Sequence, residues 1–277
     1  MKCVLLYANP DAALDSRMQA ALDVVRLHGG HLTCLQVTPY DAFIMGDPFG
    51  GVYALPTVIE QVQKTAGEHR TRTEERLGGE GVAWDWQRFD GAPAQLIVDR
   101  ARLSDLIVLS LPGGEGGAEA PRAIAADVLV HARAPVLAVP QGSRGPSTAL
   151  GTGFDGAAAA LVAWDGSLEA SHALRLTLPM LEHAAATNVV TVTDGHTEFP
   201  ATDACAYLAR HGIEAELHEW PRQGRSTAAA LLDAAASLGA GYVVMGAYGH
   251  TRLREAVLGG ATRDMLHQSQ LPLLMAH

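Results

Sequence analysis

Residues 126–137 read ADVLVHARAPVL, and residues 263–274 read RDMLHQSQLPLL. The two stretches share Asp, Leu, Pro and Leu at matching places, and each matching pair lies 137 residues apart. Just upstream, residues 105–109 (DLIVL) correspond to residues 241–245 (GYVVM) at an offset of 136, so one residue is gained in the glycine-rich loop between the segments. A repeat that slips only in a loop indicates a duplicated domain.

Short aliphatic and β-branched runs alternate with longer segments of helical periodicity along the chain. This alternation is typical of parallel strands joined by crossover helices. We therefore predict an α/β fold of two tandem doubly wound domains, each a five-stranded, mainly parallel sheet flanked by helices. In the first half the expected strands are Cys3–Ala8, His31–Val37, Val82–Gln87, Asp105–Leu109 and Val136–Val139. In the second half they are Ala159–Ala163, Val189–Thr193, Glu214–Glu219, Tyr242–Met245 and Leu273–Met275.

The repeat also predicts the domain boundaries. Residues 1–140 form the first predicted domain and residues 157–277 the second, because residues 141–156 lack periodicity and are typical of a linker. The first half carries an insertion at residues 39–56, which is open to interpretation as a lid, a contact surface or an ordinary connector. Helical spacing of apolar residues predicts one helix from Glu169 to Glu182.

Composition limits the partners that the chain can have. The 277 residues include 20 basic and 30 acidic ones, and the formal net charge of −10 opposes general attraction to nucleic acid or anionic lipid. Apolar residues make up 48% of the chain but occur in short runs, none long enough for a membrane span. The first residues, MKCVLLYANP, are interrupted too soon for a signal peptide, so we expect a cytoplasmic protein with no nucleic-acid or membrane partner.

A glycine-rich loop follows the fourth strand of the second half. Gly246 and Gly249 come directly after the strand. Nine residues, 250–258, then separate Gly249 from Gly259 and Gly260, and Thr262 follows at the start of the next helix. Glycines at such places let backbone N–H groups approach an anion, and the helix N-terminus adds further N–H groups. The spacing indicates a phosphate-binding loop, although glycines also serve simply to cap strands and helices.

The spacing Gly-x-x-Gly, nine residues, Gly resembles the ATP-binding signature of the universal stress proteins, whose fold is of the adenine-nucleotide alpha-hydrolase-like type. The segments WDGS (164–167) and LPLLM (271–275) also resemble that family. The resemblance implies that ATP or a related adenine nucleotide, with or without Mg²⁺, binds in the second half. Asp165 would border the adenine near the strand end at Val192, and the loop with Thr262 would hold the phosphates.

The sequence departs from the family pattern in two places. The hydroxyl residue expected after Gly259 is replaced by Gly260, which removes a side-chain contact to the phosphates. In the first half Asn9 stands where the family has Asp, and Glu115 and Glu119 place negative charge in the corresponding loop. We expect this first copy to be degenerate and empty.

No catalytic motif accompanies the glycine loop. The sequence has no H-E-x-x-H, no G-x-S-x-G, no P-loop lysine and no close Cys and His pair with metal spacing, so we predict no catalytic residue and no metal site. Three interpretations remain open: a regulatory stress-tolerance protein that binds a nucleotide, a nucleotide-free scaffold or dimerisation protein, and a slow ATP hydrolase.

The resemblance and the repeat also lead to expectations about assembly. Besides the nucleotide, an unidentified protein partner is expected, and a homodimer is left open. An exposed apolar edge strand requires a partner, so we expect the two halves to pair as an internal pseudo-dimer through Pro135–Val139 and Pro272–Ala276.

Overall fold

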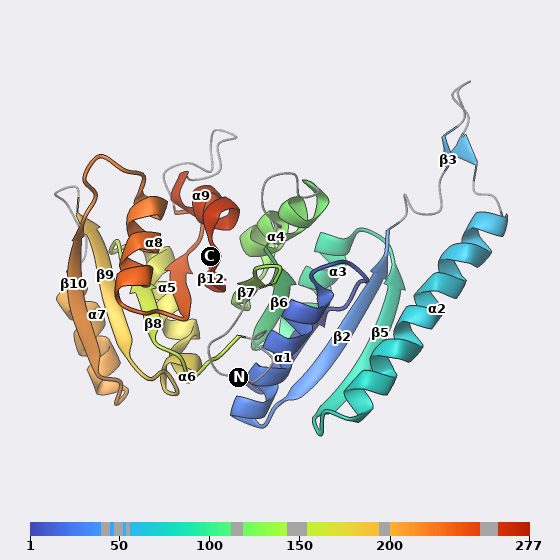
Figure 1. The fold of residues 1–277 in the computed structure, drawn as a ribbon, viewed down its shortest axis with the longest axis horizontal. Coiled ribbons are helices and arrows are strands. Elements are labelled where there is room, and N and C mark those ends of the chain that lie inside the picture. Colours follow the sequence, from blue (N-terminus) through green and yellow to red (C-terminus); the bar gives the residue numbers. More distant parts are fainter. Residues whose placement is uncertain are drawn as a thin grey trace.

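One sheet of ten strands runs through the whole molecule (Figure 1). The computed structural model describes residues 1–39, 45–46, 52–53, 56–111, 119–142, 154–193, 200–249 and 260–277. The strands of the first half are β1 (Cys3–Tyr7), β2 (His31–Thr38), β5 (Ala83–Asp90), β6 (Leu106–Ser110) and β7 (Val136–Val139). Those of the second half are β8 (Ala160–Ala163), β9 (Thr187–Thr193), β10 (Ala215–Pro221), β11 (Tyr242–Gly246) and β12 (Leu273–Ala276).

The two halves have the same topology. The order across the sheet is β10-β9-β8-β11-β12-β7-β6-β1-β2-β5, so in each half the third strand lies outermost and the fifth lies at the centre of the molecule. Within each half, every pairing between strands of this ten-stranded sheet is parallel. The predicted fold class is thereby confirmed, and all ten expected strands are present. The domain boundaries at 140 and 157 stay a prediction.

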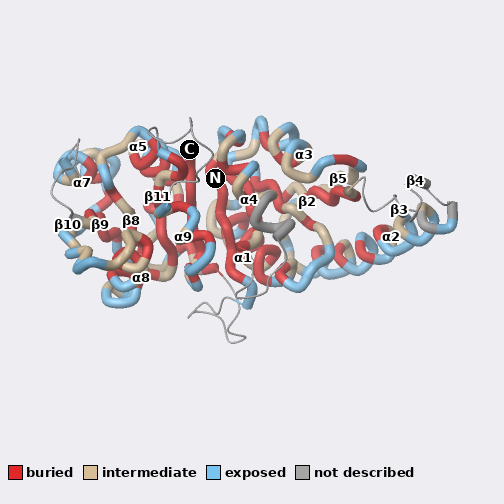
Figure 2. The backbone as a smooth tube through the Cα atoms, turned by 90° about the horizontal axis from the view of Figure 1, so that it is seen from above, coloured by how far each residue is buried: buried red, intermediate tan, exposed pale blue. Residues whose placement is uncertain are grey.

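The halves are joined by their last strands. β12 pairs antiparallel with β7, and the register places Leu274 opposite Leu137. Every residue of both strands is buried. This is the edge pairing expected from the repeat, and it makes two five-stranded sheets into one. Figure 2 shows the buried residues concentrated in the middle of the molecule, where the two halves meet.

Helices cover both faces of the sheet. One core contains side chains of α1 (Leu14–His28), α2 (Pro56–Gly78), α5 (Leu168–Leu176), α6 (Leu178–Leu181) and α7 (Ala201–Arg210). The other contains side chains of α3 (Pro93–Arg100), α4 (Glu119–His131), α8 (Thr227–Ser237) and α9 (Gly260–Gln268), and η2 (Ala101–Leu103) follows α3. Alternate residues of one strand, such as Leu5 and Leu6, enter different cores, as the two-residue period of a strand requires.

The structure corrects one predicted helix. The segment expected to be a single helix from Glu169 to Glu182 is two helices, α5 and α6, which meet at Thr177. Pro179 lies in the first turn of α6. Proline has no backbone N–H and its ring clashes with the carbonyl group four residues earlier in a helix, so α5 cannot continue through this position.

The insertion at 39–56 is described only in part. Met45–Gly46 (β3) and Val52–Tyr53 (β4) form a small antiparallel pair. The rest of this insertion, up to the start of α2, and most of the predicted linker lie outside the described residues. Among the helices of the described residues, none has the length and apolarity needed to cross a membrane.

The pairing of β7 with β12 can be tested with a double-mutant cycle. Leu137 and Leu274 are fully buried register partners in the same core. We expect Leu137→Ala and Leu274→Ala each to lower the free energy of unfolding by about 2–5 kcal/mol, because each leaves a cavity. The double variant should deviate from the sum by about 0.5 kcal/mol or more, since the two side chains are in contact range.

The measurement is urea unfolding of the three variants. As a control, Leu137→Ala is combined with Leu208→Ala in α7, which is also fully buried but packs on the outermost strands β9 and β10, far from β7 in the strand order. This control pair should be additive. If Leu137→Ala and Leu274→Ala were equally additive, the strands would not be paired in solution.

Candidate functional site

The predicted site residues gather at the carboxyl ends of three neighbouring strands of the second half. Asp165 lies two residues beyond β8, Val192 lies near the end of β9, and Gly246 ends β11. Gly249 follows β11, and Gly260 and Thr262 lie in the first turn of α9. Gly259 lies outside the described residues. The carboxyl ends of parallel strands, at a point where the chain connections diverge, are where doubly wound sheets bind ligands.

A tight turn between β8 and α5 fixes Asp165. Its Oδ1 atom accepts hydrogen bonds from the Ser167 backbone N–H at 3.0 Å and from the Ser167 hydroxyl at 2.6 Å. Gly166 between them has φ 78°, in the left-handed region that glycine tolerates. Ser167 also caps α5, since its Oγ accepts from the Ala170 N–H at 3.1 Å. The Asp165 side chain is exposed, with one carboxylate oxygen used by the turn.

Gly246 is a glycine for a packing reason. A Cβ atom at this position would lie 2.5 Å from the Ala170 nitrogen and 2.6 Å from the Glu169 carbonyl carbon. These are backbone atoms at the start of α5, which cannot move aside without moving the helix. The first turn of α5 is therefore pressed against the end of β11, and only glycine permits this approach. The close packing of α5 therefore supports the interpretation that Gly246 serves a purely structural role.

Gly249 and Gly260 differ from Gly246. A Cβ at Gly249 would make one ordinary contact, 3.6 Å from Glu169 Oε2, and at Gly260 it would meet nothing within 4 Å. Neither glycine has a left-handed backbone; in the described part of this loop Tyr248 does, with φ 57°. Among the described residues, then, nothing crowds these two glycines as the backbone of α5 crowds Gly246.

Tyr248 and Thr262 together fasten the loop to α9. The Tyr248 N–H donates to the Thr262 hydroxyl at 3.3 Å, and both residues are buried. The sequence suggested Thr262 as a phosphate ligand, which stays a prediction; in the structure its hydroxyl accepts a hydrogen bond from the loop backbone and can still donate its own proton. Burial, with a smaller effect from the charge of Asp127, raises the pKa of Tyr248 to about 12. Because Asp127 belongs to α4, a charge of the first half acts on Tyr248.

Sequence reasoning missed Tyr248 and Glu169. Tyr248 occupies an unspecified position of the Gly-x-x-Gly pattern, and only its backbone conformation and burial distinguish it. Glu169 is a buried acidic residue in the first turn of α5, and its carboxyl group lies beside Gly249. An acidic residue in a first helical turn is usual, because it complements the helix dipole, so the pattern gave no signal that it reaches the glycine loop.

In the first half, a side chain bonds to the strand backbone at the position that corresponds to Val192. The carboxamide of Asn9 makes two hydrogen bonds to one residue of β2: Nδ2 donates to the Val37 carbonyl at 2.6 Å, and Oδ1 accepts from the Val37 N–H at 2.7 Å. In a parallel sheet both backbone groups of one residue point to the same neighbouring strand. Asn9 thus hydrogen-bonds to both the N–H and the C=O of Val37, which lie beyond the last residue of β1.

The equivalence of the halves follows from the backbone. The N–H of Ala8, the first residue after β1, donates to Leu35 at 2.8 Å. The N–H of Trp164, the first residue after β8, donates to Val190 at 2.9 Å. One residue further on, the first half has Asn9 and the second half Asp165. Two residues further along the partner strands, β2 has Val37 and β9 has Val192.

The two halves differ at this matched place. Asn9 bonds to Val37, whereas the Asp165 carboxylate turns to Ser167. Among the described residues, no side chain bonds to Val192 as Asn9 does to Val37. The second half therefore leaves a donor and an acceptor of the backbone facing the carboxyl edge of the sheet.

Arg17 fills more of the first half's edge. Its side chain is 1% exposed. Nε donates to the Tyr7 carbonyl at 2.6 Å, Nη1 donates to Asp11 at 2.6 Å and to the Ser110 hydroxyl at 3.0 Å, and Nη2 donates to the Asn9 carbonyl. Ser110 ends β6 and so corresponds to Gly246 of β11. Arg17 thus builds a buried hydrogen-bond network at this edge of the first half, and the expectation that the first copy is empty stays a prediction.

No group of three or more His, Cys, Asp or Glu residues able to hold a metal ion occurs among the described residues.

The packing role of Gly246 predicts a stability difference within the loop. Gly246→Ala should lower the free energy of unfolding by about 1–3 kcal/mol without any ligand, because the new methyl group meets the α5 backbone. Gly249→Ala and Gly260→Ala should change it by no more than about 0.5 kcal/mol. Urea unfolding of the three variants measures this, and a Gly246→Ala variant as stable as the other two would contradict the close packing of α5 on β11.

Comparison with known proteins identifies the fold. No protein-family model matches the sequence, and no curated protein matches it. A universal stress protein from Archaeoglobus fulgidus DSM 4304 has a similar structure, with a TM-score of 0.72, 16% sequence identity and coverage of 99% of this chain and 97% of its own. A functionally unknown protein from Pseudomonas aeruginosa PAO1 matches with a TM-score of 0.58, 17% identity and coverage of 99% and 92%.

A universal stress protein family protein from Arabidopsis thaliana, whose structure has AMP bound, covers 50% of this chain and 92% of its own at 14% identity and a TM-score of 0.35. AMP is the ligand of that plant protein. The similarity to the archaeal protein extends over both halves of the chain. The chain therefore has the fold of the universal stress proteins.

Proposed function

We propose that the chain is a regulatory protein of the universal stress class that binds one adenine nucleotide, in its second half. The observation that supports this most is the contrast between Val37 and Val192. In the first half the Asn9 carboxamide satisfies both backbone groups of Val37. In the second half the same two groups of Val192 have no such partner among the described residues.

The chemistry of the carboxamide indicates the ligand. A carboxamide offers one acceptor and one donor side by side. Adenine offers the same pair on its Watson–Crick edge, the ring nitrogen N1 and the amino group N6. An adenine placed at Val192 would make the two hydrogen bonds that Asn9 makes at Val37. The Asp165 carboxylate would border it from the turn before α5.

The glycine loop suits the phosphates of such a ligand. Gly249 and Gly260 leave space for an anion next to the first turn of α9, whose free N–H groups and dipole favour negative charge. Mg²⁺, where present, would come with the phosphate oxygens, which are its usual ligands together with water. The regulatory role under stress, the action through a protein partner and the cytoplasmic location belong to the same proposal.

A nucleotide-free scaffold is the second candidate function. Two observations favour it: Gly246 is explained by the packing of α5, and the Glu169 carboxyl group lies beside Gly249, where it disfavours phosphate. Slow ATP hydrolysis is the enzymatic alternative. Mass spectrometry of small molecules released from the purified chain separates the scaffold from the other two, and release of ADP from added ATP then separates the hydrolase from the binding protein.

The Asp165→Asn variant tests the base site. An asparagine at this position can turn to Val192 as Asn9 turns to Val37, so we expect ATP binding to weaken about tenfold or more, the equivalent of one or two hydrogen bonds to the base. Asp165→Ala is the matched control, because it removes the carboxylate without supplying a carboxamide. Titration calorimetry with ATP should rank the affinities wild type, Asp165→Ala, Asp165→Asn. Equal losses in the two variants would refute the carboxamide argument.

The Gly260→Ser variant tests the phosphate site. The open space at Gly260 accommodates a serine side chain, whose hydroxyl can donate to a phosphate oxygen. Hydrogen bonds to charged groups contribute about 1.5–3 kcal/mol, so ATP affinity should rise roughly ten- to a hundredfold in calorimetry. Gly260→Ala is the control and should bind as the wild type does. If neither the wild type nor Gly260→Ser binds ATP at millimolar concentration, the nucleotide-free scaffold is the better account.

A further inference from the structure

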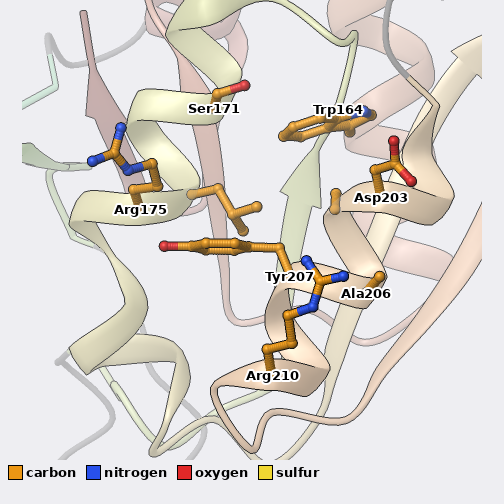
Figure 3. A pocket seen from close by; sticks show the side chains of 9 residues that line it. Trp164, Ser171, Arg175, Asp203, Ala206, Tyr207 and Arg210 are labelled. Atoms are coloured by element: carbon orange, nitrogen blue, oxygen red, sulfur yellow. The ribbon is translucent and has the colours of Figure 1, made fainter.

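The second half has a cavity that is separate from the proposed nucleotide site. It has a volume of about 380 Å³ and lies between α5 and α7. Figure 3 shows Ser171 and Trp164 at one end and Tyr207 reaching from α7 toward α5. Among the described residues that line it, none belongs to the glycine loop. Its volume is in the range of sites for small molecules.

Aromatic and small side chains shape this cavity. The Trp164 side chain forms one wall and is 4% exposed. Tyr207 forms another wall, and its ring contacts His211 with the ring centroids 4.7 Å apart. Between them α7 contributes Ala204 and Ala206, whose short side chains leave the gap open. A lining with two aromatic side chains, the aliphatic Leu174 and two alanines suits a flat aromatic ring.

Charged groups from both helices line the cavity. Asp203 is in the first turn of α7 and Arg210 is in its last turn, roughly 10 Å apart along the helix at 1.5 Å per residue. Arg175 lies on α5 across the gap. Within the described part of the chain, neither guanidinium group has an ion pair or hydrogen bond. Two cations and one anion give this lining a positive balance, although the whole chain has a net charge of −10.

From these features we propose that the cavity binds a small aromatic carboxylate that carries a hydrogen-bond donor at its far end. The ring lies between Trp164 and Tyr207. The carboxylate accepts hydrogen bonds from Arg210, whose planar fork matches its two oxygens, and Arg175 adds a second positive charge. The donor at the other end of the ligand faces the Asp203 carboxylate. A ligand with a single negative charge balances this lining, in which two arginines and one aspartate leave one net positive charge.

The probe for this site is 4-hydroxyphenylacetate, titrated into the full chain without nucleotide. We expect saturable binding in calorimetry and in ligand-observed NMR. Phenylacetate lacks the donor and 4-hydroxyphenylacetamide lacks the charge, so each should bind about tenfold more weakly or worse. Absence of saturable binding at millimolar concentration, or equal affinity for the acid and its amide, would overturn the proposal.

Three variants assign the contacts. Arg210→Gln should weaken 4-hydroxyphenylacetate about tenfold or more. Asp203→Asn should weaken the binding of 4-hydroxyphenylacetate and leave the binding of phenylacetate unchanged. Only the first ligand has a hydroxyl that can donate a hydrogen bond to the Asp203 carboxylate. Arg102→Gln, an exposed arginine of the first half that pairs with Asp99, is the matched control and should change neither. Circular dichroism checks that all three fold. Wild-type affinity in Arg210→Gln would refute the site.

Discussion

The antiparallel pairing of β7 with β12 is the interaction on which the rest of this structure depends. In each half the last strand is apolar and buried on both faces, and alone it would expose a row of unpaired backbone groups at a sheet edge. Pairing the two edges with each other satisfies those groups. The strands left at the outer edges, β5 and β10, are the ones with partly exposed, polar residues such as Arg88 and Glu219. Duplication thus solves the edge problem within one chain.

The same backbone supports opposite states of the carboxyl edge in the two halves. At the end of β6 the first half has Ser110, which takes part in the network of Arg17. At the end of β11 the second half has Gly246, which lets α5 approach until a Cβ would overlap its backbone. In the first half a long side chain fills the edge, and in the second the helix itself moves close. Among the residues that the structure describes, the Val37 backbone has a side-chain partner and the Val192 backbone has none.

Sequence alone predicted the strands, the repeat and the edge pairing because these depend on short apolar runs and on spacing. The break at Thr177 was also within reach, since Pro179 is visible in the sequence, but the apolar period of Glu169–Glu182 outweighed it. The Asn9 contact with Val37 was beyond sequence reasoning, because it joins residues 28 apart through side-chain orientation. Gly246 is a different case: a glycine needed for packing and a glycine needed for a phosphate have the same letter, and only the neighbouring atoms distinguish them.

The contrast between Asn9 and Asp165 has a thermodynamic consequence for the whole chain. Backbone groups removed from water need partners, and a missing partner costs free energy comparable to a hydrogen bond. The first half supplies a partner for the Val37 backbone from its own Asn9. Under the proposed function, a bound base would supply the equivalent partner for the Val192 backbone and would stabilise the folded chain. The proposed site also lies close to the contact between the halves, since the charge of Asp127 on α4 affects the pKa of Tyr248 in the glycine loop, and β12, which pairs with β11, also pairs with β7. If a nucleotide binds at this site, its effect on stability would therefore extend to the pairing of β7 with β12.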